Sequence, residues 1–411
     1  MKGVLILIDG VADTGCKQLG GKTPLEIANK PNLDSISRKS ELAYMYSVKE
    51  KFVPESDKAV LSILGNDVSE SLRGQLEALG ADIKLQRGDL ALRTNFATVA
   101  SLPEAKVIDR RAGRTLTSVE AEILAKAIND KVKLPCKFIF KNTIQHRGVL
   151  VLKGGFSDNI TNTDSAYHAA GKFVLAEKFK FSEPLDEEEN SKYTANVVNE
   201  FVEQSYKILN EHPINLARRK KGLLPANIIL TRDAGIEIPK IKKFKKWAAI
   251  AYMPLEIGIA KASDMKVFSF NYPNFKNHDV YQNLHDGLKS AAQFAINTLK
   301  KQAKNYDYFY IHFKETDVPG HDNKPFEKVA MIEELDRQFF SYIVNLLGKR
   351  KIRIVVTADH ATPCNLKSHS ADIIPVLIYN GKEDGKSFTE NEAKKGKKIY
   401  GKELLDFAGF K

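Results

Sequence analysis

The sequence predicts an α/β protein built on a mostly parallel sheet with helices on both faces. Three apolar runs lead to this class, because each is short, almost continuous and ends in or near an acidic residue. They are residues 3–9 (GVLILID), 308–317 (YFYIHFKETD) and 352–360 (IRIVVTADH). Such runs are typical of strands that are covered on both faces. Helical patterns lie around them, so strands and helices alternate at both ends of the chain.

Two helices are expected in the C-terminal half, where apolar residues recur at spacings of three and four over 284–299 and 329–346. Gly348 is expected to end the second helix. The central part differs, with strands expected at 89–99, 138–142, 146–154 and 227–233, a helix at 194–212 and a surface loop at 181–191. We therefore expect an inserted domain of α/β or α+β type at 86–237, within a first domain made of 1–85 and 238–411.

The composition excludes several classes of protein. With 43% hydrophobic and 28% charged residues, the chain resembles an ordinary soluble protein. No apolar run approaches the roughly 18 residues of a membrane span. The N-terminal apolar stretch stops at Asp9 without a small-residue cleavage site, so no signal peptide is expected. Three scattered cysteines do not make a disulfide framework, which indicates a reducing compartment and predicts a cytoplasmic location.

The formal net charge of +12 suits an anionic small-molecule substrate. The basic runs at 217–221, 243–247 and 394–398 are dispersed, as is typical of solvated surfaces. No nucleic-acid-binding motif is present. We expect neither nucleic acid nor a membrane as a partner, and these patterns leave the oligomeric state open.

Candidate metal ligands stand at the carboxyl ends of the three predicted strands, where ligands gather in open α/β sheets. A single aspartate at a strand end is more often a cap. Six nitrogen and oxygen donors from three strand ends, however, suit two divalent cations better than one. Pro319 and Gly320 predict a loop between the two donors of the second strand. The six donors are Asp9, Asp317, His321, Asp359, His360 and His369.

Ser56 has two competing interpretations. It stands where a helix through Ala59 and Leu64 would begin, so it could be an ordinary N-cap. A hydroxyl at a helix N-terminus also lies in a positive field that suits a phosphate. Beside a divalent cation its pKa would fall, which would make it a nucleophile. The metal-type residues favour the second role.

Ordered motifs extend along nearly the whole chain and resemble those of one family, the archaeal-type, 2,3-bisphosphoglycerate-independent phosphoglycerate mutases of the alkaline phosphatase superfamily. Two departures are visible, Glu55 where a small residue is expected and a glycine-poor stretch at 253–275. The motifs that carry the likeness are LILIDGVAD (5–13), KTPLEIANKPNLDSIS (22–37), PESDKAVLSILGND (54–67), RGQLEALGADI (73–83), GDLALRTNFATV (88–99), DRRAGR (109–114), SDNITNTD (157–164), HPINLARRKKGLLPANIILTRDAG (212–235), HFKETDVPGHDN (312–323) and TADHATPCNLKSHSAD (357–372).

The resemblance implies an alkaline-phosphatase-like catalytic domain with an inserted substrate-binding or lid domain. It implies an isomerase of glycolysis and gluconeogenesis that interconverts 3-phosphoglycerate and 2-phosphoglycerate through a phosphoserine at Ser56, without 2,3-bisphosphoglycerate. Two divalent cations are implied, Mn²⁺ or Mg²⁺ first, with Co²⁺ or Zn²⁺ as alternatives. The implied ligands are Asp317, His321 and His369 for one cation and Asp9, Ser56, Asp359 and His360 for the other.

Substrate contacts are expected from the inserted domain and from Lys314, just ahead of Asp317. Aspartates would bind the glycerate hydroxyls, arginines its carboxylate or phosphate, and a histidine would serve as acid or base. An arginine on a strand or loop is ordinarily a solvated charge, so each of these residues also has a purely structural interpretation. The candidates are Asp158, Asp164, Arg110, Arg111, Arg147, Arg232 and His146, together with Lys314.

Two other functions stay open at this point. A phosphomonoesterase or a phosphotransferase for another small alcohol could use the same metal site, and only the inserted domain would distinguish it. A basic scaffold or nucleic-acid-binding protein with a degenerate site is the other alternative. The presence of all seven proposed ligands counts against degeneration.

Overall fold

A computed structural model describes residues 1–68, 72–166, 178–237, 239–273, 280–383 and 385–410. The chain divides into two compact units. The first consists of Met1–Ser69, Ile241–Tyr252 and Ser263–Lys411, and the second of Glu70–Lys240 and Met253–Ala262. The second unit thus begins before residue 86 and takes a further ten-residue segment from beyond residue 237.

The first unit is built on an eight-stranded sheet. Strands β1, β10, β8, β9 and β11 are paired in parallel, as are β13 and β2, while β12 runs antiparallel to both of its neighbours. The predicted α/β class with a mostly parallel sheet is therefore confirmed. In spatial order the strands are β13 (Lys397–Tyr400), β2 (Ser40–Tyr46), β12 (Ile374–Tyr379), β11 (Arg353–Thr357), β1 (Gly3–Ile8), β10 (Tyr308–Phe313), β8 (Trp247–Ile250) and β9 (Lys266–Phe268).

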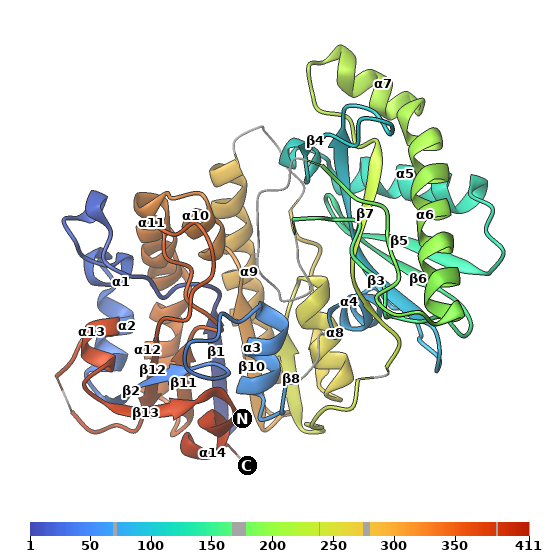
Figure 1. Ribbon diagram of the computed structural model, residues 1–411. Helices are drawn as coiled ribbons and strands as arrows, with labels where there is room; N and C mark the ends of the chain where they lie inside the picture. Colours follow the sequence, from blue (N-terminus) through green and yellow to red (C-terminus); the bar gives the residue numbers. More distant parts are fainter. Residues whose placement is uncertain (69–71, 167–177, 238, 274–279, 384, 411) are drawn as a thin grey trace. The chain divides into compact units, whose positions relative to one another are not determined.

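Helices pack against this sheet, among them α9 against β10 and α2 against β2 and β12 (Figure 1). The three central strands β11, β1 and β10 are almost wholly buried, which explains their continuous apolar sequences. The helices are α1 (Pro24–Ile27), α2 (Pro31–Ser37), α3 (Ser56–Ile63), α9 (Val280–Gln302), α10 (Asp317–His321), α11 (Pro325–Leu335), α12 (Ser341–Leu347), α13 (Glu390–Ala393) and α14 (Leu404–Phe407).

The helix expected over 329–346 and its end at Gly348 are confirmed, whereas the loop expected between Asp317 and His321 is not. The pattern over 329–346 is one helical stretch in which a π-helical segment, Asp336–Phe340, joins α11 to α12. The loop predicted between Asp317 and His321 is wrong, because these five residues form α10. Pro319 lies in the first turn of α10, where the missing N–H of proline has no intrahelical partner to lose.

The second unit carries a five-stranded antiparallel sheet, in which β3 pairs with β4, β6 and β7 and β6 also pairs with β5. Its main core lies between this sheet and the helices α5 and α6. The helix α6 begins at Glu189, inside the predicted loop 181–191. The elements are β3 (Leu90–Val99), β4 (Val107–Asp109), β5 (Phe138–Ile144), β6 (Arg147–Leu152), β7 (Ile228–Gly235), α4 (Arg73–Gly80), α5 (Ser118–Lys131), α6 (Glu189–Asn210), α7 (Pro213–Lys220) and α8 (Pro254–Ala262).

Glycines explain why α8 belongs to the second unit. A Cβ added at Gly258 of α8 would lie 1.8 Å from the carbonyl oxygen of Leu76 in α4, and one added at Gly80 would lie 1.9 Å from that of Pro254. The two helices therefore approach closely because neither carries a side chain at the crossing. Within the described ranges, no helix combines the length and the hydropathy that crossing a membrane requires.

Candidate active site

The three acid-terminated strands are neighbours in the first unit. Strands β11, β1 and β10 lie side by side and parallel, so their carboxyl ends share one edge of the sheet. Asp9 directly follows β1, and Asp359 comes two residues after β11. Asp317 begins α10, four residues after β10. Topology alone therefore brings the predicted carboxylates to one place.

Ser56 is the first residue of α3, and its side chain does not cap the helix. The N-cap position is Glu55. The Ser56 hydroxyl instead lies 3.2 Å from Nε2 of His360 and is almost completely buried. The N-cap interpretation of the serine is thus wrong, and its oxygen faces the predicted metal ligands.

A first group of ligand atoms surrounds Nε2 of His360. This nitrogen lies 3.1 Å from Oδ1 of Asp9 and 3.3 Å from Oδ2 of Asp359. Asp359 is oriented by backbone groups, since its Oδ1 accepts hydrogen bonds from the amides of Gly10 (3.2 Å) and His360 (3.0 Å). Its other oxygen, Oδ2, is therefore turned toward the histidine.

A second group is centred on Asp317. Its carboxylate lies 3.3 Å from Nε2 of His321 and 3.9 Å from Nε2 of His369. The His369 ring also stacks on the His360 ring at a centroid distance of 3.7 Å. The two groups are therefore adjacent and together contain all seven predicted ligands.

The outer nitrogens of the three histidines fix their tautomers. His321 and His369 each place Nδ1 on a carbonyl oxygen, that of Lys367 at 3.1 Å and that of Pro54 at 2.9 Å. A carbonyl oxygen only accepts, so Nδ1 carries the proton and the neutral ring offers the Nε2 lone pair to the site.

His360 reaches the same state through Thr362. The threonine hydroxyl donates its one hydrogen to Asp317 at 2.7 Å, so at 3.1 Å from Nδ1 of His360 it must accept. Nδ1 of His360 therefore carries a proton, so a lone pair of this ring that binds a cation or accepts from the Ser56 hydroxyl must be on Nε2. Thr362 lies in one of the family-like motifs, but a threonine beside a loop gives no signal of this role.

The electrostatics of the site require positive charge. Burial and the charge of Asp9 raise the pKa of Asp359 well above its ordinary value. Burial alone would raise the pKa of Asp9 as well, but the ammonium group of Lys314, in direct contact with its carboxylate, holds that pKa below its ordinary value. Lys314 thus lies at the proposed metal ligands.

The donor set fits a divalent cation. Oδ1 of Asp9 and Oδ2 of Asp359 are buried and accept no hydrogen bond from the described residues. Buried carboxylate oxygens without partners are costly unless a cation lies between them. Three imidazole lone pairs, three carboxylates and one hydroxyl are the oxygen and nitrogen donors of Mn²⁺, Mg²⁺, Co²⁺ and Zn²⁺ sites.

His312 is a neighbour of this site that the sequence reasoning missed. It lies on β10 and is 1% exposed. One of its ring nitrogens, a carboxylate oxygen of Asp9 and one of Asp359 all lie within 4.8 Å of one another. A histidine within an apolar strand is typical of a hydrogen-bonded core residue, so nothing in the local sequence singles it out.

The remaining predicted substrate residues belong to the second unit, and some of them pair with each other. Arg110 and Asp164 form a bidentate ion pair, with 2.8 Å between Nε and Oδ1. Asp158 accepts a hydrogen bond from the backbone amide of Ile236 at 3.3 Å. The proposed contacts of these residues with substrate stay predictions.

Arginines gather around His146 in this unit. Burial, followed by the charges of Arg147 and Arg111, lowers the pKa of His146 well below its ordinary value. Arg93 of β3 lies directly opposite Arg232 of β7, and both are buried. Burial, with the charge of Arg73, lowers the pKa of Arg93 to about 9.

The sequence reasoning missed Arg73 and Arg93 in this cluster, although both lie in family-like motifs. Glu77, whose Oε2 lies 3.5 Å from Nε of Arg93, is a nearby counter-charge. Like charges opposite each other in a sheet are unfavourable. The cluster therefore has the character of an anion-binding site.

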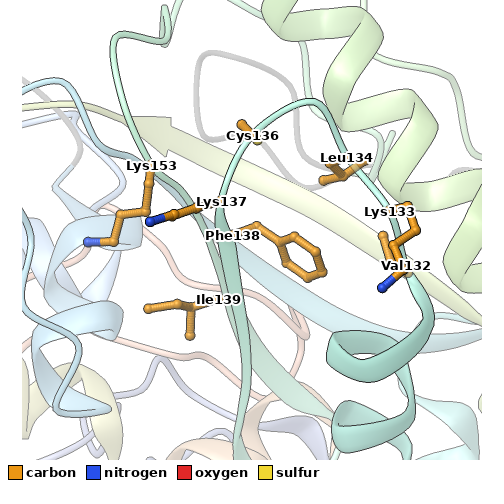
Figure 2. A pocket seen from close by; sticks show the side chains of 8 residues that line it. All are labelled: Val132, Lys133, Leu134, Cys136, Lys137, Phe138, Ile139 and Lys153. Carbon is orange, nitrogen blue, oxygen red and sulfur yellow. The ribbon is translucent and has the colours of Figure 1, made fainter.

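A pocket of about 490 Å³ lies elsewhere in the second unit, between the end of α5 and the start of β5 (Figure 2). Its lysines include Lys153, whose ammonium group is bound to Asp89 at 2.6 Å. None of the predicted site residues lines it. The lining residues are Val132, Lys133, Leu134, Cys136, Lys137, Phe138, Ile139 and Lys153.

Comparison with known proteins identifies the family. A family model described as 2,3-bisphosphoglycerate-independent phosphoglycerate mutase matches residues 37–215. Relatives that carry this name are 40% identical in Pyrococcus horikoshii (96% of this chain, 92% of the relative) and 38% identical in Aeropyrum pernix (97% and 95%). The chain belongs to the 2,3-bisphosphoglycerate-independent phosphoglycerate mutase family.

Solved structures agree with this membership. The PH0037 protein from Pyrococcus horikoshii matches with a TM-score of 0.75 at 30% identity, over 99% of this chain and 97% of that one. The cofactor-independent phosphoglycerate mutase from Thermoplasma acidophilum matches with a TM-score of 0.56 at 26% identity, over 99% and 98%. The resemblance to the mutase family that the motifs indicated is thus confirmed.

Proposed function

We propose that this mutase transfers the phosphoryl group of phosphoglycerate through Ser56, at a two-cation site made by the first unit. As a member of its family the chain is an isomerase that interconverts 3-phosphoglycerate and 2-phosphoglycerate. One observation carries the proposal: the Ser56 hydroxyl lies at the N-terminus of α3 and 3.2 Å from Nε2 of His360, beside two buried carboxylates.

The residues have distinct roles in the proposed reaction. Asp317, His321 and His369 would hold one cation, and Asp9, Ser56, Asp359 and His360 the other. Bound divalent cations lower the pKa of a coordinated hydroxyl and neutralise charge on a phosphoryl group.

The serine oxygen attacks phosphorus, the bond from phosphorus to the 3-oxygen of glycerate breaks, and the proton lost by the serine hydroxyl ends on that leaving oxygen. The glycerate 2-hydroxyl then attacks the phosphoserine, the bond from phosphorus to the serine oxygen breaks, and the proton of the 2-hydroxyl ends on the released serine oxygen. The phosphoryl group has then moved from one oxygen of glycerate to the other, and Ser56 is restored.

Lys314 is placed to assist both transfers. Its ammonium group contacts the Asp9 carboxylate, so it can approach an equatorial phosphoryl oxygen while still balancing that carboxylate. Charge-assisted contacts of this kind stabilise a phosphoryl transition state.

The second unit is proposed to hold glycerate between the two transfers. Its arginines around His146 and Arg93 suit the carboxylate of glycerate, and Asp158 and Asp164 suit its hydroxyls. Arg110, Arg111, Arg147 and Arg232 are the candidates for carboxylate or phosphate. Glycerate must stay bound while water is kept from the phosphoserine. The second unit would therefore act as a lid.

Metal stripping tests the proposal. Treatment with a chelator is expected to abolish conversion of 3-phosphoglycerate, and add-back of Mn²⁺ or Mg²⁺ should restore it without 2,3-bisphosphoglycerate. Full activity in excess chelator, or an absolute need for 2,3-bisphosphoglycerate, would contradict it.

Labelled water separates the mutase from a phosphatase on the same site. In ¹⁸O-labelled water a phosphatase incorporates solvent oxygen into the phosphate that it releases, whereas retained phosphoryl transfer leaves the phosphoryl oxygens of 2-phosphoglycerate unlabelled. Release of labelled inorganic phosphate as the main product would favour the phosphatase.

A further inference from the structure

A purely structural role does not explain the position of His312. It lies in the centre of the sheet, opposite Leu7 of β1, and its side chain is inaccessible to solvent. Its Nε2 faces two carboxylates, at 3.9 Å from Oδ2 of Asp9 and 3.7 Å from Oδ2 of Asp359. An apolar side chain could be buried at this place in the core at a lower cost in free energy, because a buried polar ring requires hydrogen-bond partners.

These two distances are longer than a hydrogen bond but close to the spacing of ligands around one ion. Donors that bind a cation at about 2.0–2.2 Å with angles between 90° and 120° lie roughly 2.8–3.8 Å from each other. Of the two separations at His312, that of 3.7 Å from Asp359 lies at the upper end of this range and that of 3.9 Å from Asp9 lies just beyond it. Those at His360, 3.1 Å and 3.3 Å to the same two aspartates, lie within the range.

The ring of His312 is held in the same manner as the ring of His360. Its Nδ1 lies 2.9 Å from the buried hydroxyl of Tyr310, two residues earlier on the same face of β10. When Nδ1 donates to this hydroxyl, Nε2 offers a lone pair toward the carboxylates. Histidines that bind metal ordinarily donate their other ring nitrogen to an oxygen in this way.

We propose that His312 is a further ligand of the cation at Asp9 and Asp359 and that Tyr310 is a positioning residue for its ring. This inference rests on the two-cation site of the proposed function. With Ser56 and His360, the site then offers five protein donors from three strand ends and one helix. Five donors exceed the four of a tetrahedral zinc site and suit a cation of higher coordination such as Mn²⁺.

Calorimetric titration of metal-free protein with Mn²⁺ tests the inference. We compare wild type with His312→Gln, Tyr310→Phe and a control, His285→Gln, on α9. His285 lies 3.7 Å from Glu327 and belongs to neither ligand group. We expect His312→Gln to weaken one Mn²⁺ site at least a hundredfold and leave the other unchanged. Tyr310→Phe should weaken the same site by about tenfold to a hundredfold, and the control should match wild type.

Co²⁺ supplies a second readout that does not depend on activity. Loss of an imidazole ligand should change the visible absorption of the Co²⁺-loaded His312→Gln protein, while His285→Gln should keep the wild-type spectrum. If His312→Gln does not fold, the same two measurements on Tyr310→Phe test the inference.

The inference and the proposed function fail in different ways. Unchanged Mn²⁺ affinity at both sites in folded His312→Gln, or in Tyr310→Phe where it alone folds, would overturn the inference and leave the two-cation site standing. Absence of Mn²⁺ binding by wild type would overturn the proposed site itself.

Discussion

Ser56 is the residue on which the proposed chemistry depends, and its replacement by alanine should separate chemistry from stability. Because the side chain makes no capping hydrogen bond, Ser56→Ala is expected to cost less than about 1 kcal/mol of unfolding free energy. Turnover should fall by about a thousandfold or more, since the proposed nucleophile, which is also a proposed metal ligand, is lost. Steady-state kinetics and thermal unfolding of the same preparation measure both effects.

Ser62→Ala is the matched control, because Ser62 is a buried serine on the same helix outside the ligand groups. It should keep turnover within a few-fold of wild type. A folded Ser56→Ala protein that retains more than about a tenth of wild-type activity would exclude the serine nucleophile.

Glu390 gives the stability of the first unit a pH dependence. Burial raises its pKa to about 7, while its carboxylate accepts hydrogen bonds from the Asp13 amide and the Thr23 hydroxyl. The native state binds this proton more tightly than the unfolded state does. The stabilisation that results is therefore complete below pH about 4.5 and is lost as the pH rises to about 7. The difference in unfolding free energy between wild type and Glu390→Gln should therefore fall over this window by up to about 3 kcal/mol.

Denaturant unfolding at several pH values measures this difference. Glu392→Gln, on the same helix α13 but in an exposed pair with Lys395, is the control and should follow wild type. Parallel pH profiles for wild type and Glu390→Gln would contradict the assignment.

Individual residues of the site were predictable to different degrees. The six aspartates and histidines at strand ends could be selected because a polar residue after an apolar run is conspicuous. Thr362 and His312 could not, because a loop threonine and a histidine inside a strand have common structural roles. Their contacts with Asp317 and with Asp9 and Asp359 appear only when the strands are placed side by side.

At the scale of elements, the turn after β1 holds the two ligand groups together. Gly10 has a φ of +57°, and a Cβ added there would lie 2.5 Å from the Thr362 hydroxyl and 2.6 Å from Oδ1 of Asp317. Gly10→Ala should therefore displace the hydrogen bond that orients both His360 and Asp317. We expect turnover and Mn²⁺ affinity each to fall by about tenfold or more.

Gly20→Ala separates this effect from backbone strain. Gly20 has a similar φ of +66°, but a Cβ added there meets no atom within 4 Å. Its replacement should lower stability by about 1 kcal/mol, as for any L-residue forced into the left-handed region, and leave Mn²⁺ affinity unchanged. Equal affinity in the two variants would mean that the Gly10 turn does not position the ligands.

The strands and long helices were predictable from periodicity, as for the apolar runs of β1, β10 and β11 and the pattern of α9. One failure involves proline. Pro319 and Gly320 predict a loop between Asp317 and His321, yet Pro319 lies in the first turn of α10, where proline is tolerated. Sequence spacing does not distinguish a proline that breaks a helix from one that begins it.

At the scale of the whole molecule, metal binding should stabilise one unit more than the other. All seven proposed ligands belong to the first unit, and the second has a core of its own between its sheet, α5 and α6. Differential scanning calorimetry should show one transition whose midpoint temperature rises with Mn²⁺. The corresponding gain in unfolding free energy is about 2.7 kcal/mol for each bound cation at a hundredfold excess over its dissociation constant. A second transition should stay in place.

The same experiment with Asp317→Asn provides the control, because the shift should shrink when a proposed ligand is lost. A single transition that moves as a whole would show that the two units unfold together.

The division of the chain was harder to predict than its class. Composition and strand character indicate that the central region differs from the two ends of the chain. The limits of that region follow from contacts that no local sequence pattern records. The segment Met253–Ala262 joins the second unit because Gly258 and Gly80 allow α8 and α4 to touch. Only the packed structure reveals that these two glycines face each other.

Direct detection of the covalent intermediate tests the central claim of phosphoryl transfer through Ser56. Protein quenched in acid during turnover of 3-phosphoglycerate should gain the mass of one phosphoryl group, mapped by fragmentation to Ser56 in the peptide containing residues 54–67. Ser56→Ala protein under the same conditions should gain none. Phosphate found on another residue in wild type, or on Ser56→Ala protein that still turns over, would contradict the mechanism.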